Sequence, residues 1–175
     1  MKKTMLVIAL GFGAMYGPGS LQLAAQQPPV RVELKDAQGQ SIGSATLSAA
    51  NSGGVSIALN ARNLSPGEHA LHIHQVAKCE PPFASAGPHF NPDSKKHGLQ
   101  NPEGPHAGDM DNFTVKADGT AQATITDPRV SLGSGSSSVF SSGGTALVIH
   151  AKADDMKTDP AGNAGDRIAC GVITK

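Results

Sequence analysis

Short runs in which apolar and polar residues alternate dominate the chain after residue 29. Alternation with a period of two sends successive side chains to opposite faces of a β-strand. Clusters of Gly, Asn, Asp and Ser separate the runs and are typical of β-turns. The pattern predicts eight strands, at residues 30–35, 41–49, 55–61, 69–76, 113–117, 121–126, 145–151 and 168–173. Eight short strands with few helical signals favour an all-β antiparallel barrel or sandwich.

Three long stretches, at residues 77–111, 127–144 and 152–167, do not follow a strand pattern. Loops of this length in a compact domain are usually functional or disordered. The first contains three histidines and a cysteine, so we predict that it is functional. Residues 127–144 are rich in Ser and Gly, and we interpret them as a plain surface crossover without identified chemistry.

The N-terminal 25 residues have the composition of a secretory signal peptide. Lys2 and Lys3 precede an apolar run at residues 5–14, and small residues follow at Ala24 and Ala25, where cleavage is expected. The apolar run is too short to span a bilayer comfortably. A buried N-terminal helix is the alternative, and a Gly-Pro-Gly sequence after the run disfavours it.

We therefore divide the chain into a signal peptide at residues 1–25, a flexible leader at 26–29 and one folded domain at 30–175. No cysteine lies near the cleavage point, so we expect no lipid or membrane anchor. The protein is predicted to be periplasmic or secreted.

The charge of the chain excludes one class of partner. Removing residues 1–25 takes two of the 14 basic residues and none of the 14 acidic ones, which leaves a net charge of −2. No basic block is present, and the chain has one Tyr and five Phe. We therefore expect no binding of nucleic acid.

The chain contains two cysteines, Cys79 and Cys170. In an exported protein an even pair predicts a disulfide bond. Such a bond would close a loop of about 90 residues and stabilise the fold by up to ~4–5 kcal/mol in the chain-entropy model. Two buried free thiols are the alternative.

Six of the seven histidines, together with Asp109, gather in two strands and one loop. His72 and His74 form an H-x-H pair, which places both rings on one face of a strand and leaves the other face for Leu71 and Ile73. Imidazole is the commonest transition-metal ligand, and it suits zinc and copper. Six histidines and an aspartate offer seven ligands, whereas two four-coordinate sites need eight positions. One shared imidazolate would close this gap, but the sequence alone does not show such sharing.

The motifs around these residues resemble the copper/zinc superoxide dismutase family, in its exported bacterial type. The similar segments follow one another in the family's order at residues 72–74, 87–92, 96–98, 106–109, 147–155 and 162–173. The resemblance covers the whole domain. It implies an eight-stranded antiparallel Greek-key barrel or sandwich with long metal-binding and substrate-guiding loops.

The resemblance also implies copper and zinc as cofactors and superoxide as the substrate. Copper would be bound by His72, His74, His89 and His150. Zinc would be bound by His89, His97, His106 and Asp109, so that His89 bridges the metals as an imidazolate. The reaction would be dismutation of superoxide to dioxygen and hydrogen peroxide, as antioxidant defence outside the cytoplasm.

Further residues receive roles from the same resemblance. Arg167 would lie over the copper and attract the anionic substrate, and His89 would take part in catalysis as well as binding. Asp154 would accept hydrogen bonds from one copper-side and one zinc-side imidazole, because ligating histidines usually donate their other N–H to a carboxylate or carbonyl. The disulfide between Cys79 and Cys170 would tie the metal-binding loop to the last strand.

Some assignments have alternatives. His69 lies three residues before His72, so strand alternation points it away from the metal face, and we expect it to form structural hydrogen bonds. Arg167 could instead be a surface salt-bridge partner. Asp155, next to Asp154, is expected to be solvated. The segment at residues 156–161 is shorter than in animal cytosolic members, which leaves the substrate guidance and a homodimer interface open.

Two other functions compete with the enzyme. A non-catalytic protein of the same fold would bind copper and zinc without turnover. A zinc hydrolase would need an open zinc position and a general base. Glu103 is the only glutamate within the histidine cluster, and the zinc set is already full. We therefore favour the dismutase.

Overall fold

Residues 27–175 are described by a computed structural model. They form nine strands, namely β1 (Val30–Asp36), β2 (Ser41–Ala49), β3 (Val55–Ala61), β4 (Gly67–His69), β5 (Leu71–His74), β6 (Phe113–Val115), β7 (Ala121–Asp127), β8 (Thr145–His150) and β9 (Arg167–Ile173). Two 3₁₀ turns, η1 (Ala84–Ala86) and η2 (Ser141–Gly143), interrupt the loops. The predicted signal peptide lies outside the described residues. Among residues 27–175, no helix is long and apolar enough to cross a membrane.

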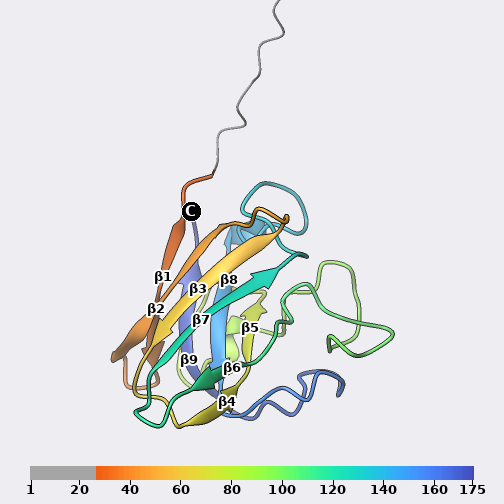
Figure 1. The fold of residues 1–175 in the computed structure, drawn as a ribbon. Coiled ribbons are helices and arrows are strands. Elements are labelled where there is room, and N and C mark those ends of the chain that lie inside the picture. Colours follow the sequence, from red (N-terminus) through yellow and green to blue (C-terminus); the bar gives the residue numbers. More distant parts are fainter. Residues whose placement is uncertain (1–26) are drawn as a thin grey trace, which may run out of the picture.

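Seven strands form one antiparallel sheet in the order β5-β8-β9-β1-β2-β3-β7. The sheet curls around its apolar face, and the short β4–β6 pair lies across one end (Figure 1). The connection at residues 128–144 carries the chain from β7, at one edge, to β8, beside the other edge. The predicted antiparallel all-β fold is confirmed.

The single strand predicted at residues 69–76 is wrong, because the structure divides it in two. Ala70 N donates to Lys152 O at 2.9 Å, and His150 N donates to Ala70 O at 3.0 Å. These bonds to the end of β8 separate β4, which pairs with β6, from β5, which pairs with β8. The second strand ends at His74, since Gln75 N and Val76 N donate to carbonyls of the following loop.

The hydrophobic core lies on the concave face of the sheet. Alternate residues of each strand point inward, as in β3, where Val55, Ile57 and Leu59 are buried and the residues between them are more exposed. The surface crossover predicted at residues 127–144 is only partly at the surface. Val130, Leu132 and Val139 from this segment are buried in the main core. The crossover therefore helps to close the core as well as connecting two strands.

Candidate metal centre

Strand β5 carries the first two candidate ligands on the face that its pleat predicts. Leu71 and Ile73 are fully buried in the core, and the intervening His72 and His74 face the other side. Both histidines are nevertheless fully buried, because the 77–111 loop folds back over them and pairs His89 with His74. The alternation of side chains along β5 thus puts both histidines on one face of the strand, and the 77–111 loop covers that face.

Four histidines, His72, His74, His89 and His150, form the set that the resemblance predicts to bind copper, which is called the copper-side set below. Their candidate ligand atoms all lie within 4.8 Å of one another. His74 Nε2 and His150 Nε2 are 3.4 Å apart. Within residues 27–175, neither His72 Nδ1 nor His89 Nε2 has a hydrogen-bond partner, although both atoms are buried. Buried polar atoms are normally paired, so two unpaired imidazole nitrogens facing one point fit a bound metal ion.

The second set is predicted by the resemblance to bind zinc and is called the zinc-side set, or zinc set, below. It combines His89, His97, His106 and Asp109, whose candidate ligand atoms also lie within 4.8 Å of one another. Asp109 Oδ1 is 2.8 Å from His89 Nδ1, 3.0 Å from His97 Nδ1 and 3.2 Å from His106 Nδ1. Three imidazole nitrogens and one carboxylate oxygen are a donor set that suits tetrahedral zinc.

His89 belongs to both sets through different atoms of one ring. Its Nδ1 faces Asp109, whereas its Nε2 is the unpaired atom on the copper side. The sequence left open how seven side chains could fill two four-coordinate sites. The structure places one imidazole between the two sets, which is the arrangement that sharing requires.

Burial favours the neutral form of three copper-side imidazoles, those of His74, His89 and His150. It lowers the pKa of His150 to about 3 and that of His89 to about 4, and it lowers the pKa of His74 well below the ordinary value. Neighbouring imidazoles add to the effect on His150 and His74. At neutral pH each of these three rings therefore has one nitrogen with a free lone pair, which can bind a metal ion without first losing the extra proton of an imidazolium.

The pKa of His97, on the zinc side, shifts in the opposite direction. Burial opposes its protonation, but hydrogen bonds to Asp109 and Asp154 outweigh burial and raise the pKa of His97 to about 9. The Asp109 carboxyl is also desolvated, yet hydrogen bonds from His106, His89 and His97 hold its pKa well below the usual range. The metal-free zinc set therefore stores a proton on His97 at neutral pH.

Zinc binding is accordingly expected to release about one proton per ion at pH 7, because zinc needs the neutral Nδ1 of His97. The apparent zinc affinity should rise about tenfold per pH unit between pH 6 and 8, below the pKa of His97. Titration of the metal-free protein in weak buffer with a pH indicator measures the proton. A pH-independent affinity would contradict the assignment, and Asp154→Asn should flatten the dependence by removing one carboxylate.

Asp154 links the two sets from behind. It accepts a hydrogen bond from His72 Nε2 at 2.8 Å and one from His97 Nε2 at 3.0 Å. These are the ring nitrogens opposite the candidate ligand atoms, so the carboxylate orients both rings. A Cβ at Gly162 would overlap the Asp154 carboxylate and the His97 ring, which explains the glycine at this position.

The structure adds two positioning contacts that sequence analysis missed. The side-chain amide of Asn112 forms two hydrogen bonds with the backbone of Asp154. Asn112 Nδ2 donates to Asp154 O, and Asp154 N donates to Asn112 Oδ1, both at 2.9 Å. Asp159 Oδ1 accepts the backbone N–H of His97 at 2.7 Å. Each pair is distant in sequence and belongs to no motif, so no local pattern could have indicated it.

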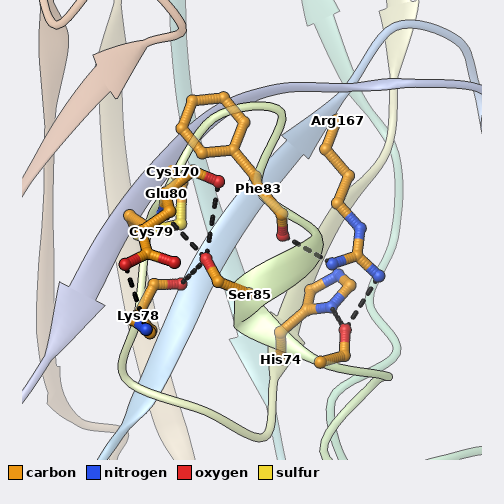
Figure 2. The surroundings of a disulfide bond; sticks show 9 residues. His74, Lys78, Cys79, Glu80, Phe83, Ser85, Arg167 and Cys170 are labelled. Carbon is orange, nitrogen blue, oxygen red and sulfur yellow. Dashed lines mark hydrogen bonds and ion pairs between the residues drawn. A yellow bond between two sulfur atoms is a disulfide. The ribbon is translucent and has the colours of Figure 1, made fainter.

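Arg167 is anchored by the loop that the disulfide holds (Figure 2). Its Nη1 donates to Phe83 O at 2.7 Å, and its Nη2 donates to Gly87 O at 2.8 Å. Gly87 O is also 2.8 Å from Nδ1 of His74, so one carbonyl connects the guanidinium to a copper-side histidine. Arg167 makes no salt bridge with any described residue, and the salt-bridge alternative is therefore not supported.

Cys79 and Cys170 form the predicted disulfide, with their Cα atoms 5.7 Å apart. The alternative of two free thiols is wrong. The bond joins the 77–111 loop to β9, the strand that begins with Arg167. Ser85 organises the bonded loop, because its hydroxyl accepts the N–H of Glu80 at 2.8 Å and lies 3.2 Å from Lys78 O (Figure 2).

Two neighbouring residues have structural roles. His69 lies outside both sets, with Nδ1 2.7 Å from His150 O and Nε2 2.8 Å from Ser65 O, which confirms the predicted hydrogen-bonding role. Asp155 is exposed, as expected for a solvated carboxylate, and it also has a local structural role. Its oxygens accept hydrogen bonds from Thr158 and Asn163, which shape the short loop and lower the pKa of Asp155 to about 2.

The fold and the site together define a dinuclear metalloprotein, in which a curled antiparallel sheet and its loops hold two histidine-rich sets that share one imidazole. The model of the copper/zinc superoxide dismutase family matches residues 41–173. The chain therefore belongs to the copper/zinc superoxide dismutase family. The description of the family confirms copper and zinc as the cofactors.

Individual relatives agree with this result. Superoxide dismutase [Cu-Zn] 1 of Aquifex aeolicus is 53% identical over 152 residues, which cover 85% of this chain and 89% of the relative. A double mutant of a SOD-like protein from Bacillus subtilis superimposes with a TM-score of 0.80 at 39% identity, over 83% of this chain and 97% of that one. Cu/Zn superoxide dismutase from Brucella abortus gives a TM-score of 0.68 at 28% identity, over 83% and 99%.

Proposed function

We propose that this protein is a superoxide dismutase that binds copper at the set containing His150 and zinc at the set containing Asp109. The observation that carries the proposal is the pair of complete ligand sets meeting at His89, with buried nitrogens that lack partners in the described part of the chain. When bound, copper would supply one-electron redox chemistry and zinc a fixed positive charge without redox chemistry.

The protein's own residues would handle the substrate and one proton. Arg167 is half-buried and carries a charged guanidinium whose position two backbone carbonyls fix. It would draw the small superoxide anion to the copper side and hold it there. His89 Nε2, the unpaired atom between the two sets, would take up a proton and return it to the reduced substrate. Zinc-side contacts at Nδ1 would keep the ring in place during this transfer.

The two competing functions fit the site less well. A non-catalytic protein that only binds copper and zinc would not need an arginine anchored beside the copper-side set, and this chain has one. A zinc hydrolase needs a zinc ion with an open position next to a general base. The zinc-side set offers four ligands, and Glu103 is exposed and pairs with Lys96 at 2.9 Å.

The decisive experiment measures superoxide dismutation by the disulfide-bonded protein loaded with copper and zinc, against the same protein loaded with zinc alone. Rapid turnover that requires copper is the expected result. Absence of turnover with one copper bound per chain would overturn the proposal and favour the non-catalytic alternative. Turnover of a hydrolysable ester by the zinc-only form would favour the hydrolase.

Replacing Arg167 by alanine is expected to lower the dismutation rate by about tenfold to a hundredfold, since electrostatic guidance of this kind changes association rates by about 10–10³. Copper content should not change, because the two hydrogen bonds of the guanidinium go to backbone carbonyls and not to ligand side chains. Stopped-flow decay of superoxide measures the rate. Arg31→Ala, on the exposed face of β1, is the matched control. Equal rates for the two variants would exclude a role for Arg167 in guidance.

We also propose that the protein works in the periplasm or after secretion. The disulfide supports this location, because such bonds persist in oxidising compartments. A homodimer remains part of the proposal as an expectation from the family resemblance. Cell fractionation and light scattering of the purified protein test location and assembly separately.

A further inference from the structure

A buried ion pair connects the end of the barrel wall to the zinc side of the centre. Asp127, the last residue of β7, is fully buried. Its Oδ1 accepts the backbone N–H of Arg129 at 3.0 Å and lies 2.9 Å from Arg129 Nη2. Asp127 Oδ2 has no hydrogen-bond partner among residues 27–175. The carboxylate therefore depends on Arg129 for all of its observed hydrogen bonds.

The same Nη2 of Arg129 donates a second hydrogen bond to the backbone carbonyl of Asp109. Asp109 lies in irregular chain between His106 and β6, so no strand holds its backbone. Its side chain is the centre of the zinc-side set and accepts five hydrogen bonds from this set and its loop. The position of this backbone therefore decides where the carboxylate oxygens lie.

The anchor at the other end of this connection is rigid. Asp127 pairs with Val55 of β3 at the end of a seven-residue antiparallel ladder. The chain of contacts thus runs from the β3–β7 ladder through Asp127 and Arg129 to the Asp109 carbonyl. It also gives a function to the start of the crossover at residues 127–144, where the sequence indicated no chemistry.

A contribution to the free energy of unfolding does not explain why Asp127 and Arg129 form a buried ion pair. Burial raises the pKa of Asp127 to about 6, although the positive charge of Arg129 acts in the opposite direction. The desolvation of the carboxylate therefore outweighs its attraction to the guanidinium. Apolar residues of similar volume often replace buried ion pairs without loss of stability. An apolar pair, however, could not donate the hydrogen bond that holds the backbone carbonyl of Asp109.

We infer that Arg129 is a positioning residue for the zinc set, which fixes the backbone of Asp109 to the barrel wall while Asp127 holds the guanidinium in place. The inference rests on the proposed role of Asp109 as a zinc ligand. Partners that orient metal ligands typically contribute 10–100-fold to metal affinity. We expect an effect of this size on zinc and little effect on copper, because among the described residues Arg129 forms hydrogen bonds and an ion pair with Asp109 and Asp127 and none with a copper-side histidine.

The test uses the double variant Asp127→Asn/Arg129→Met, since Arg129→Met alone would leave a buried carboxylate without a cation and could prevent folding. Competition with a chromophoric chelator gives the zinc dissociation constant of the disulfide-bonded protein. We expect a 10–100-fold increase in this constant and an altered visible spectrum of the Co²⁺-substituted site. Arg62→Met is the matched control and should change neither quantity, because Arg62 is exposed and its Nη2 donates only to the backbone carbonyl of Ser41 at 3.5 Å.

An unchanged zinc constant, within about twofold, together with a wild-type Co²⁺ spectrum would overturn the inference and leave the pair a purely structural role. His106→Ala separates this failure from failure of the proposed function. If His106→Ala weakens zinc binding and the double variant does not, only the inference fails. If neither variant weakens zinc binding, the assignment of the zinc set is itself wrong.

Discussion

Replacing His150 by alanine is expected to reduce copper-dependent dismutation by on the order of a thousandfold or more, as for the loss of other essential active-site groups. The variant removes one of four nitrogens that converge on the copper side. It also opens a cavity where a buried ring stood, so water would compete with the remaining imidazoles for the metal. Copper content after dialysis and stopped-flow decay of superoxide are the two measurements.

Zinc content provides the internal control for this variant. His150 belongs to the copper-side set alone, and the zinc-side residues make their contacts through Asp109 and Asp154. We therefore expect one zinc per chain in His150→Ala, as in the wild type. A variant that keeps more than a tenth of the wild-type rate with bound copper would show that His150 is not a ligand. Loss of both metals would instead indicate a folding defect.

Removing the disulfide, with Cys79→Ser and Cys170→Ser together, is expected to lower the free energy of unfolding of the metal-free protein by about 3–5 kcal/mol. The bond closes a loop with a sequence separation of 91, so the unfolded chain without it gains much conformational freedom. The free loop would also loosen Phe83 O and Gly87 O, the two acceptors that hold Arg167. A fall in activity should therefore accompany the fall in stability.

Denaturant titration of the metal-free variant and wild type, both monitored by circular dichroism, measures the change in free energy. Ser85→Ala is the control, because it removes hydrogen bonds within the same loop and keeps the covalent link. We expect Ser85→Ala to lower the free energy of unfolding by only about 1 kcal/mol. A loss below about 1 kcal/mol in the double-serine variant would mean that packing alone holds the loop on β9.

Most strands could be predicted because their pattern is local. In β3 and β7 the alternation of apolar and polar residues follows directly from the pleat, and the predicted limits differ from the observed ones by at most one residue. The strand at residues 69–76 could not be predicted as two, because the division depends on bonds between Ala70 and residues about 80 positions later. A local pattern carries no information about a partner so far along the chain.

The metal centre likewise has features that the sequence could predict and features that it could not. Its residue types and the H-x-H spacing of His72 and His74 indicate metal binding, because imidazole chemistry and strand geometry are local properties. The supporting contacts of Asn112, Asp159 and Arg129 carry no such indication. Each is an ordinary polar residue that acquires its role only where another loop comes within hydrogen-bonding distance.

The sequence by itself determined the all-β class, the pair of cysteines and the seven side chains of the two sets, since these follow from periodicity and from the chemistry of residue types. Only the tertiary structure decided that His89 directs Nδ1 to one set and Nε2 to the other. Which nitrogen faces which neighbour depends on how the 77–111 loop packs over β5. That packing is a sum of many long-range contacts, and no short stretch of sequence encodes it.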